Sequence, residues 1–161
     1  MDGTVSKILY CTDLSQNAIY AFKHAAHLAK ITKADIHVLH VIVELPTDAL
    51  VAIQSYIMNS EQRRNLLDDR KVNAKAHLDK CYDDFFAELP GEDQSIRDQI
   101  KSIDVIESYP AEQILKSSVK LGCDLIIMGA HEKGMTHTFL GSVAKSVLRR
   151  SRVPTLIVPL P

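Results

Sequence analysis

The chain has 161 residues, 46% of them hydrophobic and 24% charged, which is the composition of a folded globular protein and not of a disordered chain. Its 19 lysines and arginines nearly balance its 20 aspartates and glutamates, which argues against a nucleic-acid partner because such binders carry a basic excess. The longest apolar runs, such as Leu125–Ala130, are far shorter than the ~20 residues of a membrane span, so we expect one soluble domain over residues 1–161 that makes no membrane contact.

The N-terminus and the cysteines indicate the cellular compartment. Residues 1–4 lack the basic and apolar regions of a secretion signal, so we expect a cytoplasmic protein. Cys11, Cys81 and Cys123 form no CxxC pair, which argues against both a disulfide framework and a zinc site. His37 and His40 stand three apart on a predicted strand and therefore point to opposite faces, so we expect no metal site there.

The first part of the chain predicts a strand, a helix and a second strand. The apolar runs Lys7–Cys11 and Ile36–Ile42 are typical of buried strands. Between them, Ser15 can cap a helix whose apolar residues recur at steps of three and four, namely Ala18, Phe22, Ala25 and Ala29. A strand, a crossover helix and a strand in this order favour a parallel sheet.

The middle of the chain predicts one long helical region. A loop beginning at Glu44–Pro46 leads into it, and we expect an irregular segment within residues 44–65. Pro90 and Gly91 end the region, because both residues break helices. Apolar residues recur near the helical period at Leu67, Ala74, Leu78, Cys81, Phe85 and Leu89.

The last part of the chain predicts three more strands with helices between them. Alternation around Ile103 and Val105 indicates a strand at a sheet edge, and Leu125–Met128 indicates one near the centre. Pro110 opens the helix that lies between these two strands. A last helix begins after Gly141, with Val143, Ala144, Val147 and Leu148 facing inward. Pro154 favours an edge position for the final strand, Val153–Val158.

This alternation predicts an α/β fold, an open, doubly wound, five-stranded parallel sheet with helices on both faces, and thus a Rossmann-like architecture. Ligands of such sheets bind outside the carboxyl ends of the strands. Thr12 and Asp13 follow the first strand, and Gly129–Ser142 follows the fourth. Glycine allows close backbone approach, and the helix start at Gly141 offers unpaired N–H groups to a phosphate. Asp13, Gly141 and Ser142 are equally compatible with simple capping and turn roles.

Taken together, five segments of the chain resemble the universal stress protein family over nearly the whole length. They are Lys7–Ser15, His40–Val41, Asp124–His131, Gly141–Arg149 and Val153–Pro159. The resemblance implies a five-stranded parallel sheet flanked by helices, of the adenine nucleotide alpha-hydrolase-like type. It also implies ATP binding through a loop of Gly, two residues, Gly, nine residues, and then Gly-Ser or Gly-Thr.

The resemblance also assigns roles to individual residues. Asp13 would lie at the ribose and adenine end, the Val41 backbone would meet the adenine edge, and Gly129 would start the phosphate loop. The full expected set is Thr12, Asp13, Val41, Gly129, His131, Gly134, Gly141, Ser142 and Val143, with ATP, either alone or with Mg²⁺, as the ligand. The chain departs from the family pattern where Glu132 takes the place of the second glycine, and eleven residues instead of twelve separate Gly129 from Gly141.

The resulting expectation is a stress-response regulatory protein that binds an adenine nucleotide and has at most weak ATPase activity, because no Walker motif or nucleophile elbow is present. The resemblance implies a homodimer through the final strand, at Thr155, Leu156, Ile157 and Val158, and the protein partner is unknown. The alternative, favoured by Glu132 and the shortened loop, is a dimeric protein-interaction module of the same family that does not bind nucleotide.

Overall fold

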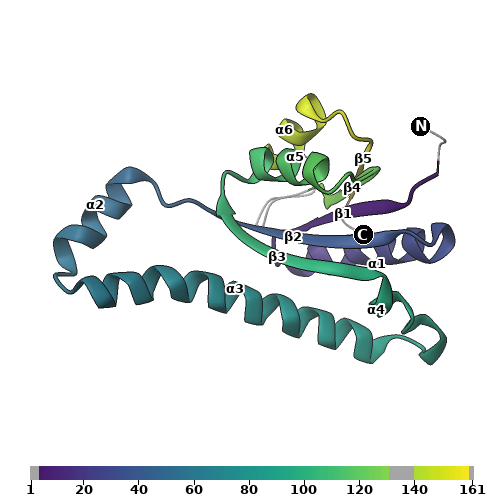
Figure 1. Cartoon of the computed structure of the whole chain (residues 1–161), viewed down its shortest axis with the longest axis horizontal. Coiled ribbons are helices and arrows are strands. Elements are labelled where there is room, and N and C mark those ends of the chain that lie inside the picture. The colour runs from purple at the N-terminus through teal and green to yellow at the C-terminus, as the bar shows by residue number, and fades with distance from the viewer. Residues whose placement is uncertain (1–3, 131–139, 160–161) are drawn as a thin grey trace.

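A computed structural model of the chain describes residues 4–130 and 140–159 (Figure 1). Its five strands are β1 (Lys7–Thr12), β2 (Asp35–Val43), β3 (Ile100–Ser108), β4 (Leu125–Gly129) and β5 (Thr155–Val158). They form one parallel sheet in the order β3-β2-β1-β4-β5. The predicted α/β class is confirmed, with β3 and β5 at the edges and β4 next to the central β1.

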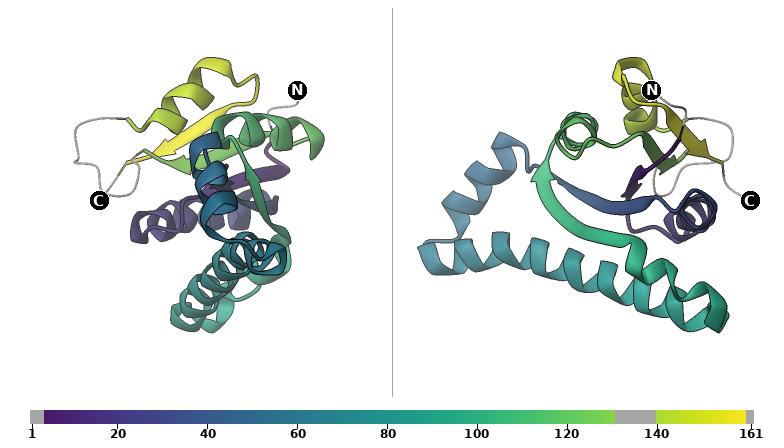
Figure 2. Two further views of the ribbon diagram at one scale, coloured as in Figure 1. Left: turned by 90° about the vertical axis from the view of Figure 1, so that its left-hand side faces the viewer. Right: turned by 45° about the vertical axis from the view of Figure 1, so that its right-hand side comes forward.

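Helices cover both faces of this sheet (Figure 2). The helices are α1 (Gln16–Thr32), α2 (Thr47–Tyr56), α3 (Ser60–Glu88), α4 (Ile96–Gln99), α5 (Pro110–Lys120) and α6 (Ser142–Arg150), with a 3-10 turn at Gly91–Asp93. Figure 1 shows α1 and α3 below the sheet and α5 and α6 above it. No helix in the described ranges is long and apolar enough to cross a membrane.

The two faces of β1 explain the two hydrophobic cores. Ile8 and Tyr10 point to the α1 and α3 side, whereas Leu9 and Cys11 point to the α5 and α6 side. Phe22 of α1 lies at the centre of the first core, and its ring contacts Tyr10 and three aromatic rings of α3, with centroid distances of 4.7 Å to Tyr82 and 4.9 Å to Phe85. Near-perpendicular ring pairs of this kind add to the apolar burial.

The irregular segment expected within residues 44–65 is limited to residues 44–46 and 57–59, and the rest forms α2 and the start of α3. Helix α3 begins because the Asn59 side chain accepts hydrogen bonds from the backbone N–H groups of Glu61 and Gln62. One sequence expectation is wrong. Leu148 does not face inward and is 44% exposed, since Ala144 and Val147 already form the buried face of α6. The predicted end of the long helix before Pro90 is confirmed.

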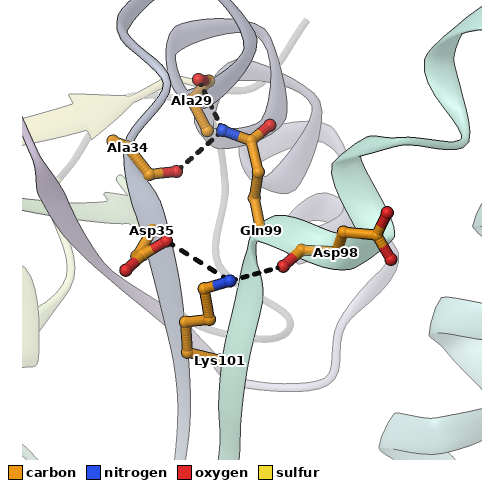
Figure 3. A network of polar contacts seen from close by, with 6 residues as sticks. All are labelled: Ala29, Ala34, Asp35, Asp98, Gln99 and Lys101. Atoms are coloured by element: carbon orange, nitrogen blue, oxygen red, sulfur yellow. Dashed lines mark hydrogen bonds and ion pairs between the residues drawn. The ribbon is translucent and has the colours of Figure 1, made fainter.

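Gln99 joins the start of β3 to the turn between α1 and β2 (Figure 3). Its Nε2 donates hydrogen bonds to the backbone oxygens of Ala29 (2.8 Å) and Ala34 (2.9 Å). Lys101, two residues further on, donates to the Asp98 oxygen at 2.8 Å and pairs with Asp35 at 3.6 Å. The register of β2 and β3 shifts at this point, between Ile36 and His37. Gln99 and Lys101 therefore hold the irregular start of the edge strand in place.

Asp124 fixes the amino-terminal end of β1, at the same edge of the sheet. Its Oδ2 accepts hydrogen bonds from the Ser6 N–H (2.8 Å), the Ser6 hydroxyl (2.6 Å) and the Lys7 N–H (2.8 Å). The bonds from Ser6, with a smaller contribution from Lys7, lower the pKa of the Asp124 carboxyl below its ordinary value, against a small opposing effect of burial. The ionised carboxylate is thus the form that joins β1 to β4.

We expect Gln99→Ala to lower the free energy of unfolding by about 1–2 kcal/mol, because two backbone oxygens lose a donor. Chemical denaturation measures this loss. The matched control is Gln94→Ala, at an exposed glutamine with no side-chain hydrogen bond to the described residues, which should change stability little. Equal effects of the two variants would contradict the anchoring role of Gln99.

We expect Asp124→Asn to destabilise the protein at pH 7 and to lose that effect in acid. The pKa of Asp124 is lower in the folded than in the unfolded chain. Its contribution to the free energy of unfolding is therefore fully present above the unfolded-state pKa of ~4 and disappears as the pH falls through the folded-state pKa. Denaturation midpoints at pH 7 and pH 3 test this, with the exposed Asp69→Asn as control. A deficit that persists unchanged at pH 3 would contradict it.

Candidate functional site

A cavity of about 710 Å³ opens at the carboxyl ends of β1, β2 and β4. The starts of α5 and α6 complete its wall. The cavity brings together seven of the residues singled out from the sequence, namely Thr12, Asp13, Val41, Gly129, Gly141, Ser142 and Val143. The other two, His131 and Gly134, lie outside the described residues, as does Glu132.

The turn after β1 holds the Asp13 carboxylate at the cavity. Asp13 Oδ1 accepts hydrogen bonds from the N–H (3.0 Å) and the hydroxyl of Ser15, whose side chain caps α1. Thr12 Oγ1 accepts from the N–H of Leu14, a residue in the left-handed region at φ 63°. A non-glycine residue in this conformation persists only where its surroundings enforce it. Asp13 is therefore oriented by a rigid turn, and its side chain remains exposed to the cavity.

The carboxyl end of β2 extends beyond β1. The last pair between the two strands is Thr12 with His40, so from Val41 onward the side of β2 that faces β1 has no strand partner. On its other side, β2 continues to pair with β3 through Val43. The Val41 backbone is thus left facing the cavity, where polar atoms of a flat ring can hydrogen-bond to it.

His40 is a cavity residue that the sequence did not single out as functional. Its Nδ1 lies 2.8 Å from the backbone oxygen of Thr12. Since a carbonyl only accepts, Nδ1 carries a proton, and Nε2 is the ring nitrogen that Thr12 does not engage. His37 bonds elsewhere, to the Ser102 hydroxyl at 2.9 Å. The sequence feature that could have indicated a role for His40 is its position next to Val41, near the carboxyl end of a predicted strand.

The start of α6 presents backbone donors to the cavity. Gly141 is the cap residue, with φ −61° and ψ 159°, and as a glycine it provides no side-chain capping hydrogen bond. Ser142 is therefore the first helical residue and not the N-cap. The N–H groups of Val143 and Ala144 lie in the first turn, where an α-helix has no internal acceptor for them. Together with the positive end of the helix dipole, they suit an anionic group.

Ala130 connects this helix start to the sheet. Its oxygen accepts a hydrogen bond from the Gly141 N–H at 2.8 Å, and its own N–H donates to the Val158 oxygen, also at 2.8 Å. The peptide groups of one residue thus join β4, β5 and α6. The position of the helix start relative to the sheet is set by these two bonds.

The cavity contains little charge. Among the described lining residues, the ionisable groups are Asp13, His40 and Cys11, and burial raises the pKa of the Cys11 thiol well above its ordinary value. The described part of the chain contains no cluster of three His, Cys, Asp or Glu residues that could hold a metal ion. The donor set fits a Mg²⁺ ion only if the ligand's phosphates supply most of its oxygen ligands, with Asp13 nearby.

Apolar side chains form the rest of the wall and were not predicted from the sequence. They include Pro110, Ile114 and Met128. A mostly apolar cavity with a few fixed polar groups is typical of a small-molecule site. The arrangement can hold a flat apolar ring against this wall and an anionic group at α6.

Comparisons with known proteins agree with this architecture. The sequence model of the universal stress protein family matches residues 4–159. Universal stress protein MJ0577 of Methanocaldococcus jannaschii is 29% identical over 159 residues, which cover 98% of this chain and 97% of that protein. The solved structure of MJ0577 matches with a TM-score of 0.71 at 28% identity and covers 96% of both chains.

Two further solved structures have the same fold at lower identity. One is a universal stress protein in complex with cAMP, at 17% identity and a TM-score of 0.57, covering 98% of each chain. The other is the universal stress protein of Archaeoglobus fulgidus in complex with dAMP, at 15% identity and a TM-score of 0.58, covering 96% of this chain and 98% of that one. The family match over residues 4–159 extends through every strand and helix described above, and the chain belongs to the universal stress protein family.

Proposed function

We propose that this chain is a cytoplasmic, single-domain stress-response regulator that binds ATP or a related adenine nucleotide in the cavity at the carboxyl edge of its sheet. The observation that carries the proposal is the convergence on one cavity of a carboxylate, a strand end that lacks a neighbour on one side, and a helix start whose cap residue is glycine, at Asp13, Val41 and Gly141. The family members in complex with cAMP and dAMP support an adenine ligand.

Each part of the nucleotide has a matching surface. The phosphates lie at Gly141–Val143, because N–H groups at a helix start bind anions. The ribose hydroxyls donate to the Asp13 carboxylate, which only accepts when ionised. The adenine ring lies along the apolar wall with its edge at the Val41 backbone. His131 and Gly134 would belong to the phosphate loop by family resemblance.

We propose binding without an efficient reaction. The described lining residues include no pair of carboxylates for a metal ion and no lysine to neutralise a leaving phosphate. The nucleotide would instead bias a conformation or an assembly, including a homodimer through the β5 edge at Thr155–Val158. If Glu132 excludes the phosphates from the loop, the chain is a protein-interaction module of the same family, and the measurements below distinguish the two functions.

We expect Ser142→Pro to weaken ATP binding about tenfold or more, measured by titration calorimetry. Proline removes one N–H group and the hydroxyl from the phosphate end, and a charge-assisted hydrogen bond contributes about 1.5–3 kcal/mol. The helix should tolerate proline, because it is favoured at the first helical position and Gly141 already has the extended conformation required before it.

The matched control is Ser60→Pro, at the first position of α3, which follows the extended Asn59 and lies outside the cavity lining. This variant should bind ATP as the wild type does. Mass spectrometry of small molecules released from gently purified protein provides a second readout. Absence of both a released nucleotide and binding heat at millimolar ATP would contradict the proposal and favour the interaction module.

We expect ATP to shift the ¹⁵N resonance of His40 Nε2, because this nitrogen is the ring atom not engaged by Thr12. Before addition, Nδ1 should carry a proton, because it faces the Thr12 oxygen. The exposed His27 of α1, outside the cavity lining, provides the control and should not respond. A shift confined to other histidines would place the ligand outside this cavity.

A further inference from the structure

His40 connects the end of β2 to the turn that follows β1. Its Nδ1–H donates a hydrogen bond to the backbone oxygen of Thr12 at 2.8 Å. Thr12 and His40 are also the last paired residues of the two strands. Because this oxygen belongs to the planar peptide group that carries the N–H of Asp13, the bond fixes the direction in which the chain enters the turn. The His40 side chain therefore ties the start of the Asp13 turn to β2.

The direction of the His40 side chain follows from the alternation along β2. Leu39 belongs to the core under α5 and α6, and Val41 packs against that core. His40 stands between them and therefore points to the other face, on the side of α1. The turn after β1 leads directly into α1, so the half-buried imidazole meets this turn where it borders the cavity.

No other side chain in the described ranges makes this connection. Asp13 Oδ1 accepts hydrogen bonds from Ser15, whose hydroxyl in turn caps α1. Thr12 Oγ1 accepts from the N–H of Leu14, within the turn itself. These bonds shape the turn and join it to α1, but none of them reaches β2. His40 is thus the side chain that sets the separation between the Asp13 carboxylate and β2.

We propose that His40 is a positioning residue that makes the cavity selective for a nucleotide with free ribose hydroxyls. The inference rests on the proposed nucleotide binding, with the adenine edge at Val41 and the ribose at Asp13. Adenine and ribose are joined covalently, so both contacts form together only if these two surfaces already have the matching separation. Without the His40 bond, the carboxylate moves away from the ribose hydroxyls while the adenine contact remains.

Two substitutions of His40 separate the Nδ1–H donor from the rest of the ring. Asparagine keeps an N–H donor near the position of Nδ1, whereas phenylalanine keeps a flat ring without a donor. Titration calorimetry with ATP and with dideoxy-ATP, which lacks both free ribose hydroxyls, measures the selectivity. We expect the wild type and His40→Asn to prefer ATP by roughly tenfold or more. His40→Phe should lose most of this preference and bind dideoxy-ATP as the wild type does.

The matched control is His37→Phe on the same strand. His37 bonds the Ser102 hydroxyl at 2.9 Å and lies outside the cavity lining, so this variant should keep the preference for ATP. A loss of stability alone would weaken the binding of both nucleotides and leave their affinity ratio unchanged. An unchanged ratio in His40→Phe would therefore overturn the proposal, and so would an equal loss of preference in His37→Phe.

Amide hydrogen exchange in the ligand-free protein separates this inference from the proposed function. The N–H groups of Leu14 and Ser15 should exchange roughly fivefold faster or more in His40→Phe than in the wild type, because the turn opens more often, and His40→Asn should restore slow exchange. Unchanged exchange in His40→Phe would overturn the positioning role even in a protein that binds ATP. Absence of ATP binding by the wild type would overturn the proposed function, and with it the selectivity for ribose.

Discussion

The parallel direction of all five strands is the constraint on which the rest of the structure depends. It forces every connection to cross the sheet as a helix, and it places every strand's carboxyl end at one edge. The turn at Asp13, the end of β2 and the start of α6 are far apart in sequence, yet they meet there for this reason. The amino-terminal edge has the opposite character, since Asp124 and Gln99 close it with internal hydrogen bonds.

The fold was predictable because its main signals are local. The spacing from Ala18 to Ala29 marks the buried face of α1, and Ser15 caps that helix as the sequence indicates. The roles of His40 and Gln99 were not predictable, because their partners are separated from them by 28 and by 65 to 70 residues and do not appear in any local pattern. The helix α2 was missed because eight of the ten residues 49–58 are apolar, so no polar face marks a helical period in the sequence.

The cavity shows how a nearly neutral protein can accommodate an anion. At the start of α6 its described wall provides backbone N–H groups in place of lysines or arginines. Backbone donors are already ordered by the helix, so they lose little conformational freedom when a ligand arrives. The sequence predicted most of these positions, because a glycine directly before a helix marks where the backbone can approach a ligand. It did not determine which residue is the N-cap of α6: the sequence was compatible with Ser142, whereas in the structure the N-cap is Gly141.

The two hydrogen bonds of Ala130 have a thermodynamic consequence. Its oxygen bonds the residue that begins α6, and its N–H bonds Val158 at the end of the edge strand β5. A movement of the helix start therefore changes the geometry of the edge strand through a single residue. If, as proposed, an anion binds at α6 and a second chain pairs with β5, and both favour the same geometry at Ala130, each would strengthen the binding of the other by the same factor. Under that proposal, occupancy of the cavity and assembly at β5 would be linked quantities.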